Sequence, residues 1–124
     1  KILHQYVFRN TKPAIFGVSV EGGKIFSGLK VIDETNENVG RVKNIQAENK
    51  SVNEATEGME VAISIPGINF EHALGDRKFL CTDMSESQFK KFKKNKDLLS
   101  SKEISLLQEI AEIKRREKSE WGNL

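Results

Sequence analysis

The sequence predicts a mainly β protein: a small closed antiparallel β-barrel over residues 1–84, followed by two C-terminal α-helices in residues 85–124. Three observations predict this class. Short segments of alternating apolar residues, separated by Gly, Asn, Asp and Pro, run from Ile2 to Thr82. At Ser85 the apolar period becomes helical. With 124 residues the chain can bury one modest core, so we expect one compact unit whose helical tail packs on the barrel or extends from it.

The first clear strand has its apolar residues on one face, namely Phe16, Val18 and Val20. The Gly22-Gly23 pair can supply the positive φ angles of a tight hairpin before Ile25 and Phe26.

A second clear strand alternates in the same way through Val61, Ile63 and Ile65. Pro66-Gly67 ends it, because proline cannot continue a hydrogen-bonded ladder. Six or seven such strands in about 84 residues favour a closed barrel, since closure removes unpaired edges.

Two capping boxes mark the starts of two helices. Ser85 with Gln88 begins a short helix, and Ser100 with Glu103 begins a longer one. Half of the second helix is apolar and must be covered; its residues are Ile104, Leu106, Leu107, Ile110, Ala111 and Ile113. The linker candidates are residues 33–38 and 95–97.

The positive charge is concentrated in the tail. Residues 1–84 contain 10 Lys and Arg against 11 Asp and Glu, a net charge of −1, whereas residues 85–124 contain 10 against 7, a net charge of +3. Residues 1–84 are so close to neutral that they cannot hold nucleic acid by phosphate attraction alone. Any RNA contact there must be small and local.

The single cysteine, Cys81, excludes an internal disulfide, and no apolar run approaches the ~18 residues that span a bilayer. Together with the absence of a signal-peptide pattern, this indicates a cytoplasmic protein with no membrane partner. Because the first residue is Lys, we expect the segment to be part of a longer polypeptide.

Catalytic and metal-binding motifs are absent from the sequence. There is no phosphate loop, no nucleophile elbow and no cluster of Cys and His at metal spacing. His4 and His72 have no carboxylate or Cys at motif spacing, and we expect Cys81 to be a buried core thiol. We therefore expect a binding module, without a catalytic residue, metal or cofactor of its own.

A basic amphipathic segment interleaves Phe89 and Phe92 with five lysines: Lys90, Lys91, Lys93, Lys94 and Lys96. Two interpretations stay open. The segment is either a solvated helix face with its phenylalanines packed inward, or a contact for RNA or an acidic peptide.

Three segments in order resemble the β-barrel that follows the GTPase domain of translational GTPases. Residues 13–28 resemble its G-x-V-x-x-G-x-I-x-x-G signature, residues 53–67 its A-x-x-G-x-x-V-A-I-x-I-x-G segment, and Gly75-Asp76 the G-D before its last strand. Residues 1–9, 113–116 and Trp121-Gly122 are similar to the last domain, domain IV, of archaeal and eukaryotic translation initiation factor 5B, the homologue of bacterial factor 2. The tight loops favour an archaeal version.

The resemblance implies a barrel of the domain II type and a role in translation initiation. In that family the parent GTPase, which uses GTP and Mg²⁺, joins the ribosomal subunits. The equivalent domain would bind the aminoacylated acceptor end of initiator methionyl-tRNA. Eukaryotic relatives further imply that the helical tail receives translation initiation factor 1A.

An aminoacyl end requires a shallow apolar slot, hydrogen bonds to sugar hydroxyls and a few phosphate contacts. Polar residues around Val42 and Ile45, and after Gly75-Asp76, are the tRNA-binding candidates: Arg41, Lys43, Asn44, Gln46, Arg77 and Lys78. Ordinary outward strand polarity is the alternative explanation for them.

A second hypothesis makes the chain a protein-docking module whose helical tail binds factor 1A. Its candidate contact residues lie on the two helices: Phe89, Phe92, Ile104, Leu107, Ala111 and Arg115.

Overall fold

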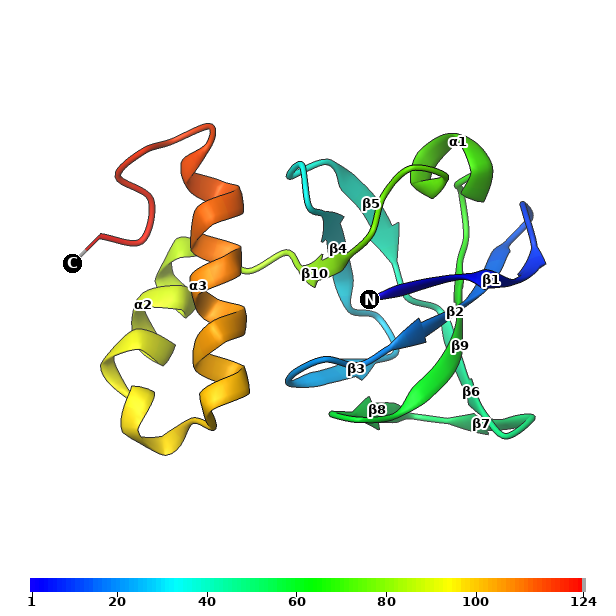
Figure 1. Cartoon of the computed structure of the whole chain (residues 1–124), viewed down its shortest axis with the longest axis horizontal. Coiled ribbons are helices and arrows are strands. Elements are labelled where there is room, and N and C mark those ends of the chain that lie inside the picture. The colour runs from blue at the N-terminus through cyan, green and yellow to red at the C-terminus, as the bar shows by residue number, and fades with distance from the viewer. Residues whose placement is uncertain (124) are drawn as a thin grey trace. The chain divides into compact units, whose positions relative to one another are not determined.

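The computed structural model describes residues 1–123. It divides into two units, Lys1–Thr82 and Asp83–Leu124, which we call the β unit and the helical unit (Figure 1). Among the described residues, no helix has both the length and the apolar character needed to cross a membrane.

The β unit, which is described throughout, consists of short antiparallel strands and one short helix. The strands are β1 (Ile2–Arg9), β2 (Ala14–Ser19), β3 (Lys24–Phe26), β4 (Lys30–Asp33), β5 (Asn38–Arg41), β6 (Asn44–Ala47), β7 (Lys50–Val52), β8 (Glu54–Thr56), β9 (Glu60–Ile65) and β10 (Leu80–Thr82). The helix, α1, spans Phe70–Leu74 and lies between β9 and β10 in the sequence.

The strands form three sheets, ordered β1-β2-β9-β6-β7, β10-β4-β5 and β3-β8. The mainly β class is therefore confirmed. Within residues 1–82, no hydrogen-bonded ladder joins the three sheets into one, so the closed barrel stays a prediction.

The predicted hairpin at Gly22-Gly23 is wrong. Gly23 does have a positive φ of 70°, but β3 pairs with β8 rather than with β2. Both edges of β2 are already occupied, by β1 on one side and β9 on the other. The β2–β9 ladder ends with Ser19 opposite Glu60, and the β3–β8 ladder resumes with Lys24 opposite Thr56. The Gly22-Gly23 pair therefore lies between the β2–β9 ladder and the β3–β8 ladder, where the chain bends but does not reverse.

The helix α1 interrupts the stretch that the sequence analysis assigned to strands. Asn69 caps it, because its Oδ1 accepts a hydrogen bond from the His72 backbone amide at 3.1 Å. Phe70 and Leu74, one turn apart, are both buried. The Phe70 ring packs on Phe16 with centroids 4.8 Å apart, so this single turn contributes to the core.

The core of the β unit contains the residues that the alternating pattern placed inside. The predicted inward faces of β2 and β9 are confirmed, since every residue on them is buried. Cys81 is also buried, as expected. His4 lies edge-on to Phe70, and its Nε2 is within hydrogen-bond distance of the Arg77 carbonyl oxygen, so it has structural contacts. The core residues are Ile2, Ala14, Phe16, Val18, Val20, Val31, Val39, Val42, Ile45, Ala55, Val61, Ile63, Ile65, Phe70 and Leu74.

The helical unit contains α2 (Glu86–Lys94), the short 3-10 turn η1 (Lys96–Leu98) and α3 (Ser101–Arg115). Both predicted capping boxes are present with both of their hydrogen bonds, at Ser85 with Gln88 and at Ser100 with Glu103. The expected linker at residues 95–97 includes most of η1.

After α3 the chain returns to the start of α2. The Trp121 ring packs on Phe89 with centroids 4.8 Å apart, and its carbonyl oxygen accepts a hydrogen bond from Arg115 Nε at 2.7 Å. The Gly122 amide donates to the Glu86 carboxylate at 3.0 Å. These contacts close the helical unit upon itself.

Candidate functional site

The polar candidates on β6 lie on the outer face of the five-stranded sheet. Asn44 and Gln46 have exposed side chains, and the residue between them, Ile45, is buried. Across β9, Asn44 is opposite Ser64 and Gln46 is opposite Ala62. The Ser64 hydroxyl accepts a hydrogen bond from the Asn44 backbone amide at 3.1 Å, which fixes the start of β6.

The row of residues that lie opposite one another on this outer face continues from β6 and β9 across β2 to β1. Ala62 is opposite Gly17 on β2, and both point away from the core because their neighbours in sequence point into it. Tyr6 covers Gly17 so closely that a Cβ at residue 17 would lie 3.0 Å from the Tyr6 Cβ. The outer face therefore has the small side chains of Ala62 and Ser64 beside the two amides, and on its other side Gly17 is covered by Leu3 and Tyr6 of β1.

Arg41 ends β5, Lys43 lies on the connection between β5 and β6, and both are exposed. The Arg41 guanidinium donates to the Gly28 carbonyl oxygen at 3.0 Å. The Lys43 backbone amide donates to the Ser64 carbonyl oxygen at 2.8 Å, while the Lys43 side chain extends from the surface. The four candidates of residues 41–46 thus lie close together in the sequence, from the end of β5 to β6.

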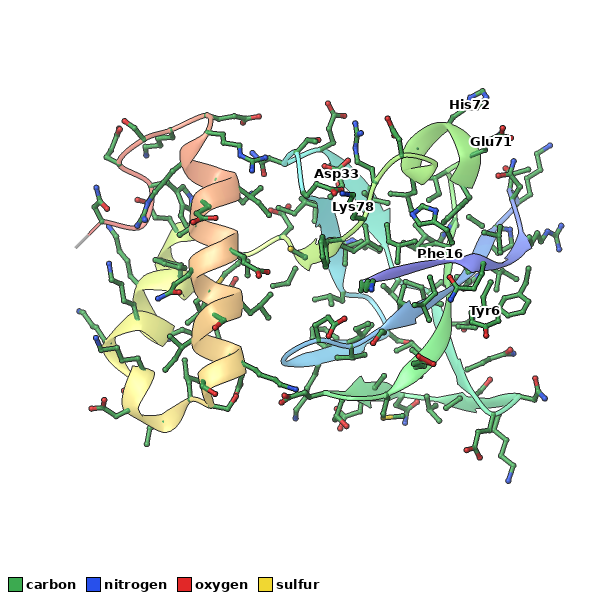
Figure 2. All side chains as sticks on the ribbon, viewed as in Figure 1. Tyr6, Phe16, Asp33, Glu71, His72 and Lys78 are labelled. Carbon is green, nitrogen blue, oxygen red and sulfur yellow. The ribbon has the colours of Figure 1, made fainter. Side chains whose placement is uncertain are left out.

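Arg77 forms an ion pair with Asp33, in which Arg77 Nε donates to Asp33 Oδ2 at 3.0 Å. Figure 2 labels Asp33 and Lys78, which lie in the same region of the β unit. Only 2% of the Asp33 side chain is exposed. Burial raises the pKa of Asp33, but hydrogen bonds from Thr35, Glu37 and Arg77 outweigh it, so the pKa lies below its ordinary value. The hydrogen bond to Asp33 in turn raises the pKa of Arg77.

Lys78 is held beside this pair through its backbone, whose amide donates to the Glu34 carboxylate at 2.9 Å. Its side chain is exposed. Asp33 ends β4, whereas Arg41 is opposite Lys30 at the start of β4. Asp33 lies three positions beyond Lys30 along β4, about 10 Å at the usual rise per residue, so the tRNA-binding candidates form two groups.

The helical candidates differ in their exposure. Phe89 and Ala111 are buried, and Arg115 is occupied by the Trp121 carbonyl. Ile104 and Leu107 are half-buried. Phe92 is 44% exposed. Phe92 is therefore the member of this set whose side chain is most available to a partner, and the partner contacts stay a prediction.

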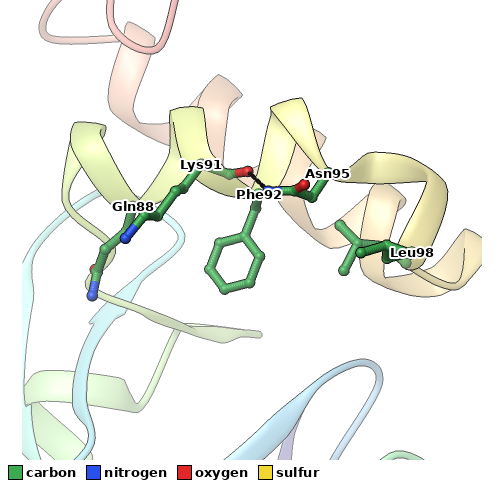
Figure 3. Close-up of a pocket in the computed structure, with 6 residues that line it drawn as sticks. Gln88, Lys91, Phe92, Asn95 and Leu98 are labelled. Atoms are coloured by element: carbon green, nitrogen blue, oxygen red, sulfur yellow. Dashed lines mark hydrogen bonds between the residues drawn. The ribbon is translucent and has the colours of Figure 1, made fainter.

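Phe92 lines a shallow groove of about 450 Å³ on the helical unit (Figure 3). The lining is mostly apolar and consists of Gln88, Lys91, Phe92, Asn95, Leu98 and Leu99. Asn95 Nδ2 donates to the Lys91 carbonyl oxygen at 2.9 Å and thereby fixes the end of α2.

The structure also exposes an aromatic pair that the sequence analysis did not single out. Tyr6 and Phe8 on β1 have nearly parallel rings, 10° apart, with centroids separated by 6.5 Å. The signal was present in the sequence: the consecutive Tyr6, Val7 and Phe8 break the alternation of a half-buried strand.

The site offers amide, guanidinium and ammonium groups, which bind polar and anionic ligands. Among residues 1–123, no group of three or more His, Cys, Asp and Glu side chains is placed to hold a metal ion.

Comparison with known proteins gives a consistent result. The family model described as elongation factor Tu domain 4 matches residues 1–71. The chain is 41% identical over 123 residues to a probable translation initiation factor IF-2 of Methanopyrus kandleri, covering 98% of this chain and 21% of that protein. It is also 41% identical over 118 residues to the corresponding factor of Aeropyrum pernix, covering 94% of this chain and 19% of that protein.

A solved structure shares the fold along almost the whole chain. The crystal structure of GDP-bound aIF5B from Aeropyrum pernix superposes with a TM-score of 0.88 at 39% identity. The match covers 99% of this chain and 21% of that one. The chain thus spans about a fifth of the length of the relatives that it matches.

Proposed function

Because the chain belongs to the elongation factor Tu domain 4 family, in the form found in the archaeal translation initiation factor IF-2 (aIF5B), we propose that it binds the aminoacylated acceptor end of initiator methionyl-tRNA. It does so as a non-catalytic module of a larger cytoplasmic GTPase that supports ribosomal subunit joining. GTP and Mg²⁺ are then bound by other parts of that protein.

One observation carries the proposal: on the outer face of the five-stranded sheet, the amides of Asn44 and Gln46 lie beside the small side chains of Ser64 and Ala62, which we call the floor. Asn44 and Gln46 can donate to and accept from ribose hydroxyls and the ester carbonyl. Ala62, opposite Gln46, leaves room for a ligand to approach the strand backbone. A methionyl group can lie along this floor.

The charged candidates supply few contacts to phosphate. Arg41 at the end of β5 and Lys43 just before β6 lie close in sequence to the two amides and can each reach one phosphate. Arg77 is paired with Asp33, so it acts chiefly by holding its segment in place. With few free cations beside the floor, we expect an affinity that is modest and depends only moderately on salt.

Alanine substitution on β6 tests this proposal. We expect Asn44→Ala and Gln46→Ala each to raise the Kd for methionyl initiator tRNA about three- to tenfold, the effect of losing one hydrogen bond. Gln108→Ala, which removes an exposed glutamine from the helical unit, is the matched control and should bind as the wild type does. Equal affinity of all four proteins would refute the assignment of the floor.

A second candidate function is supported by the groove beside Phe92. Lys91 lines it, Lys94 and Lys96 flank the lining residue Asn95 in the sequence, and no ion pair involves these lysines among the described residues. Apolar lining with surplus positive charge suits an acidic peptide that carries aliphatic side chains. The tail of translation initiation factor 1A is the partner that we propose for it.

This second candidate is tested by titrating the chain with factor 1A. We expect Leu98→Ser and Phe92→Ser to abolish saturable binding. Phe26→Ser, at an exposed phenylalanine of the β unit, should leave binding unchanged. Unaltered binding by both groove variants would refute docking at the groove and would leave the tRNA proposal untouched.

A further inference from the structure

The most exposed apolar side chains of the β unit gather on one strand. Phe8 is 64% and Tyr6 49% exposed, and Val7 between them is also exposed. We call Tyr6, Val7, Phe8 and Arg9 the aromatic edge. Such a run on the surface of a soluble protein commonly marks a binding surface.

The exposure has a structural cause in the register of β1. Leu3 is opposite Gly17, but the next paired residue, Val7, is opposite Phe16. A second shift follows, because Arg9 is opposite Ile15, so His4, Gln5, Tyr6 and Phe8 have no counterpart on β2. Bulges of this kind change the direction in which side chains point and occur often beside binding sites.

The close approach of β1 to Gly17 leaves the Tyr6 Cβ directly beside the β2 backbone. An alanine at position 17 would press on the Tyr6 Cβ at 3.0 Å. Tyr6 in turn holds its ring nearly parallel to that of Phe8, with centroids 6.5 Å apart. The pair thus presents two nearly parallel rings on β1, the strand that lies beside Gly17 at the edge of the sheet.

The charge around the aromatic edge favours an anionic partner. Residues 1–20 contain Lys1, Arg9 and Lys12 and no Asp or Glu. Arg9 Nε donates to the Thr11 carbonyl oxygen at 3.0 Å, which holds the guanidinium over the β1–β2 turn. Glu71 is also near this turn, since its backbone amide donates to Asn10, so the surface is mildly basic.

We propose that the aromatic edge binds the unpaired nucleotides of an RNA end by stacking bases on Tyr6 and Phe8 while Arg9 and Lys12 meet the phosphates. Aromatic faces beside a few cations are the usual means of holding single-stranded nucleic acid without sequence readout. This inference rests on the proposed function, because it places the unpaired nucleotides of the acceptor end beside the floor that holds the aminoacyl group.

The test combines two variants with two RNA ligands. We expect Phe8→Ala to raise the Kd for methionyl initiator tRNA fivefold or more, about the loss of one stacked base. Phe8→Trp should restore the affinity, and its fluorescence should be quenched by a short unstructured RNA oligonucleotide. Phe79→Ala, at another exposed phenylalanine of the β unit, is the matched control.

The outcomes separate this inference from the proposed function. If wild type and Phe8→Ala bind the tRNA equally well and the oligonucleotide leaves Phe8→Trp unquenched, the stacking surface is refuted and acceptor-end binding stands. If the wild-type chain binds neither RNA, both are refuted. Quenching of Phe8→Trp together with weakened binding by Phe8→Ala supports the stacking surface.

Discussion

Arg77 and Asp33, 44 positions apart in the sequence, meet in a hydrogen-bonded ion pair of 3.0 Å that ties the segment before β10 to the end of β4. The carboxylate also accepts hydrogen bonds from Thr35 and Glu37, so it organises the β4–β5 turn. The pair therefore holds together two segments that sequence reasoning had assigned to RNA contact and to a linker.

We expect Arg77→Gln to destabilise the β unit by about 1–3 kcal/mol, because it leaves a buried carboxylate without its charged partner. Thermal or denaturant unfolding measures the change. Lys78→Gln is the control, since Lys78 contacts Glu34 through its backbone amide, which the substitution keeps, and it should leave stability within about 0.5 kcal/mol of wild type. Equal unfolding of the two variants would contradict a structural role for the pair.

Acid should weaken the β unit through Asp33. Its folded-state pKa lies below the ordinary value of 3.8, so the unfolded chain binds more protons at acid pH. The stabilisation is then complete above about pH 5 and is lost as the pH falls through the folded-state pKa. Unfolding free energies measured from pH 7 to pH 3 should fall for the wild type. For Asp33→Asn they should fall less steeply, and parallel curves would contradict this assignment.

Gly122 should be irreplaceable in the helical unit. Its φ is +75°, and a Cβ there would lie 2.7 Å from the Phe89 ring. Gly58 has a φ of +89° with open space around it, so Gly58→Ala shows the cost of the backbone conformation alone. We expect Gly122→Ala to destabilise the chain by about 1–3 kcal/mol, and more than Gly58→Ala does. Trp121 fluorescence during unfolding measures the helical unit.

Glu86 should make the closure of the helical unit sensitive to acid. Hydrogen bonding from the Gly122 amide, aided by Lys118 and Lys90, lowers the pKa of Glu86 below 4.5 despite some burial. The stabilisation is therefore present above pH 4.5 and is lost at lower pH. We expect Trp121 fluorescence to shift on acidification in the wild type and less in Glu86→Gln. Glu109→Gln, on the exposed face of α3, should behave as the wild type does.

Local signals in the sequence were sufficient to predict the two helices of the helical unit, α2 and α3. Each capping box depends on residues three positions apart, and both formed as predicted. The inward faces of β2 and β9 were also predictable, because alternation is a property of a single strand. The helix α1 was missed because a single turn is too short for a periodic pattern, although Asn69 before Phe70 is an N-cap signal.

Pairing between distant segments could not be predicted in this way. The Gly22-Gly23 pair is compatible with a hairpin, and only the occupation of both β2 edges by β1 and β9 excludes one. For the same reason the sequence did not separate Arg77 from the polar residues on β6: its role depends on Asp33 in another strand. The exposure of Phe8 likewise follows from a bulge that appears only when β1 is set against β2.

The central claim, that the β unit recognises the aminoacylated end of initiator tRNA, is tested most directly by comparing methionylated with uncharged initiator tRNA in one titration at physiological salt. We expect the methionylated form to bind at least several-fold more tightly, with the difference reduced in Gln46→Ala. Equal affinity for the two forms, or no saturable binding of either, would contradict it.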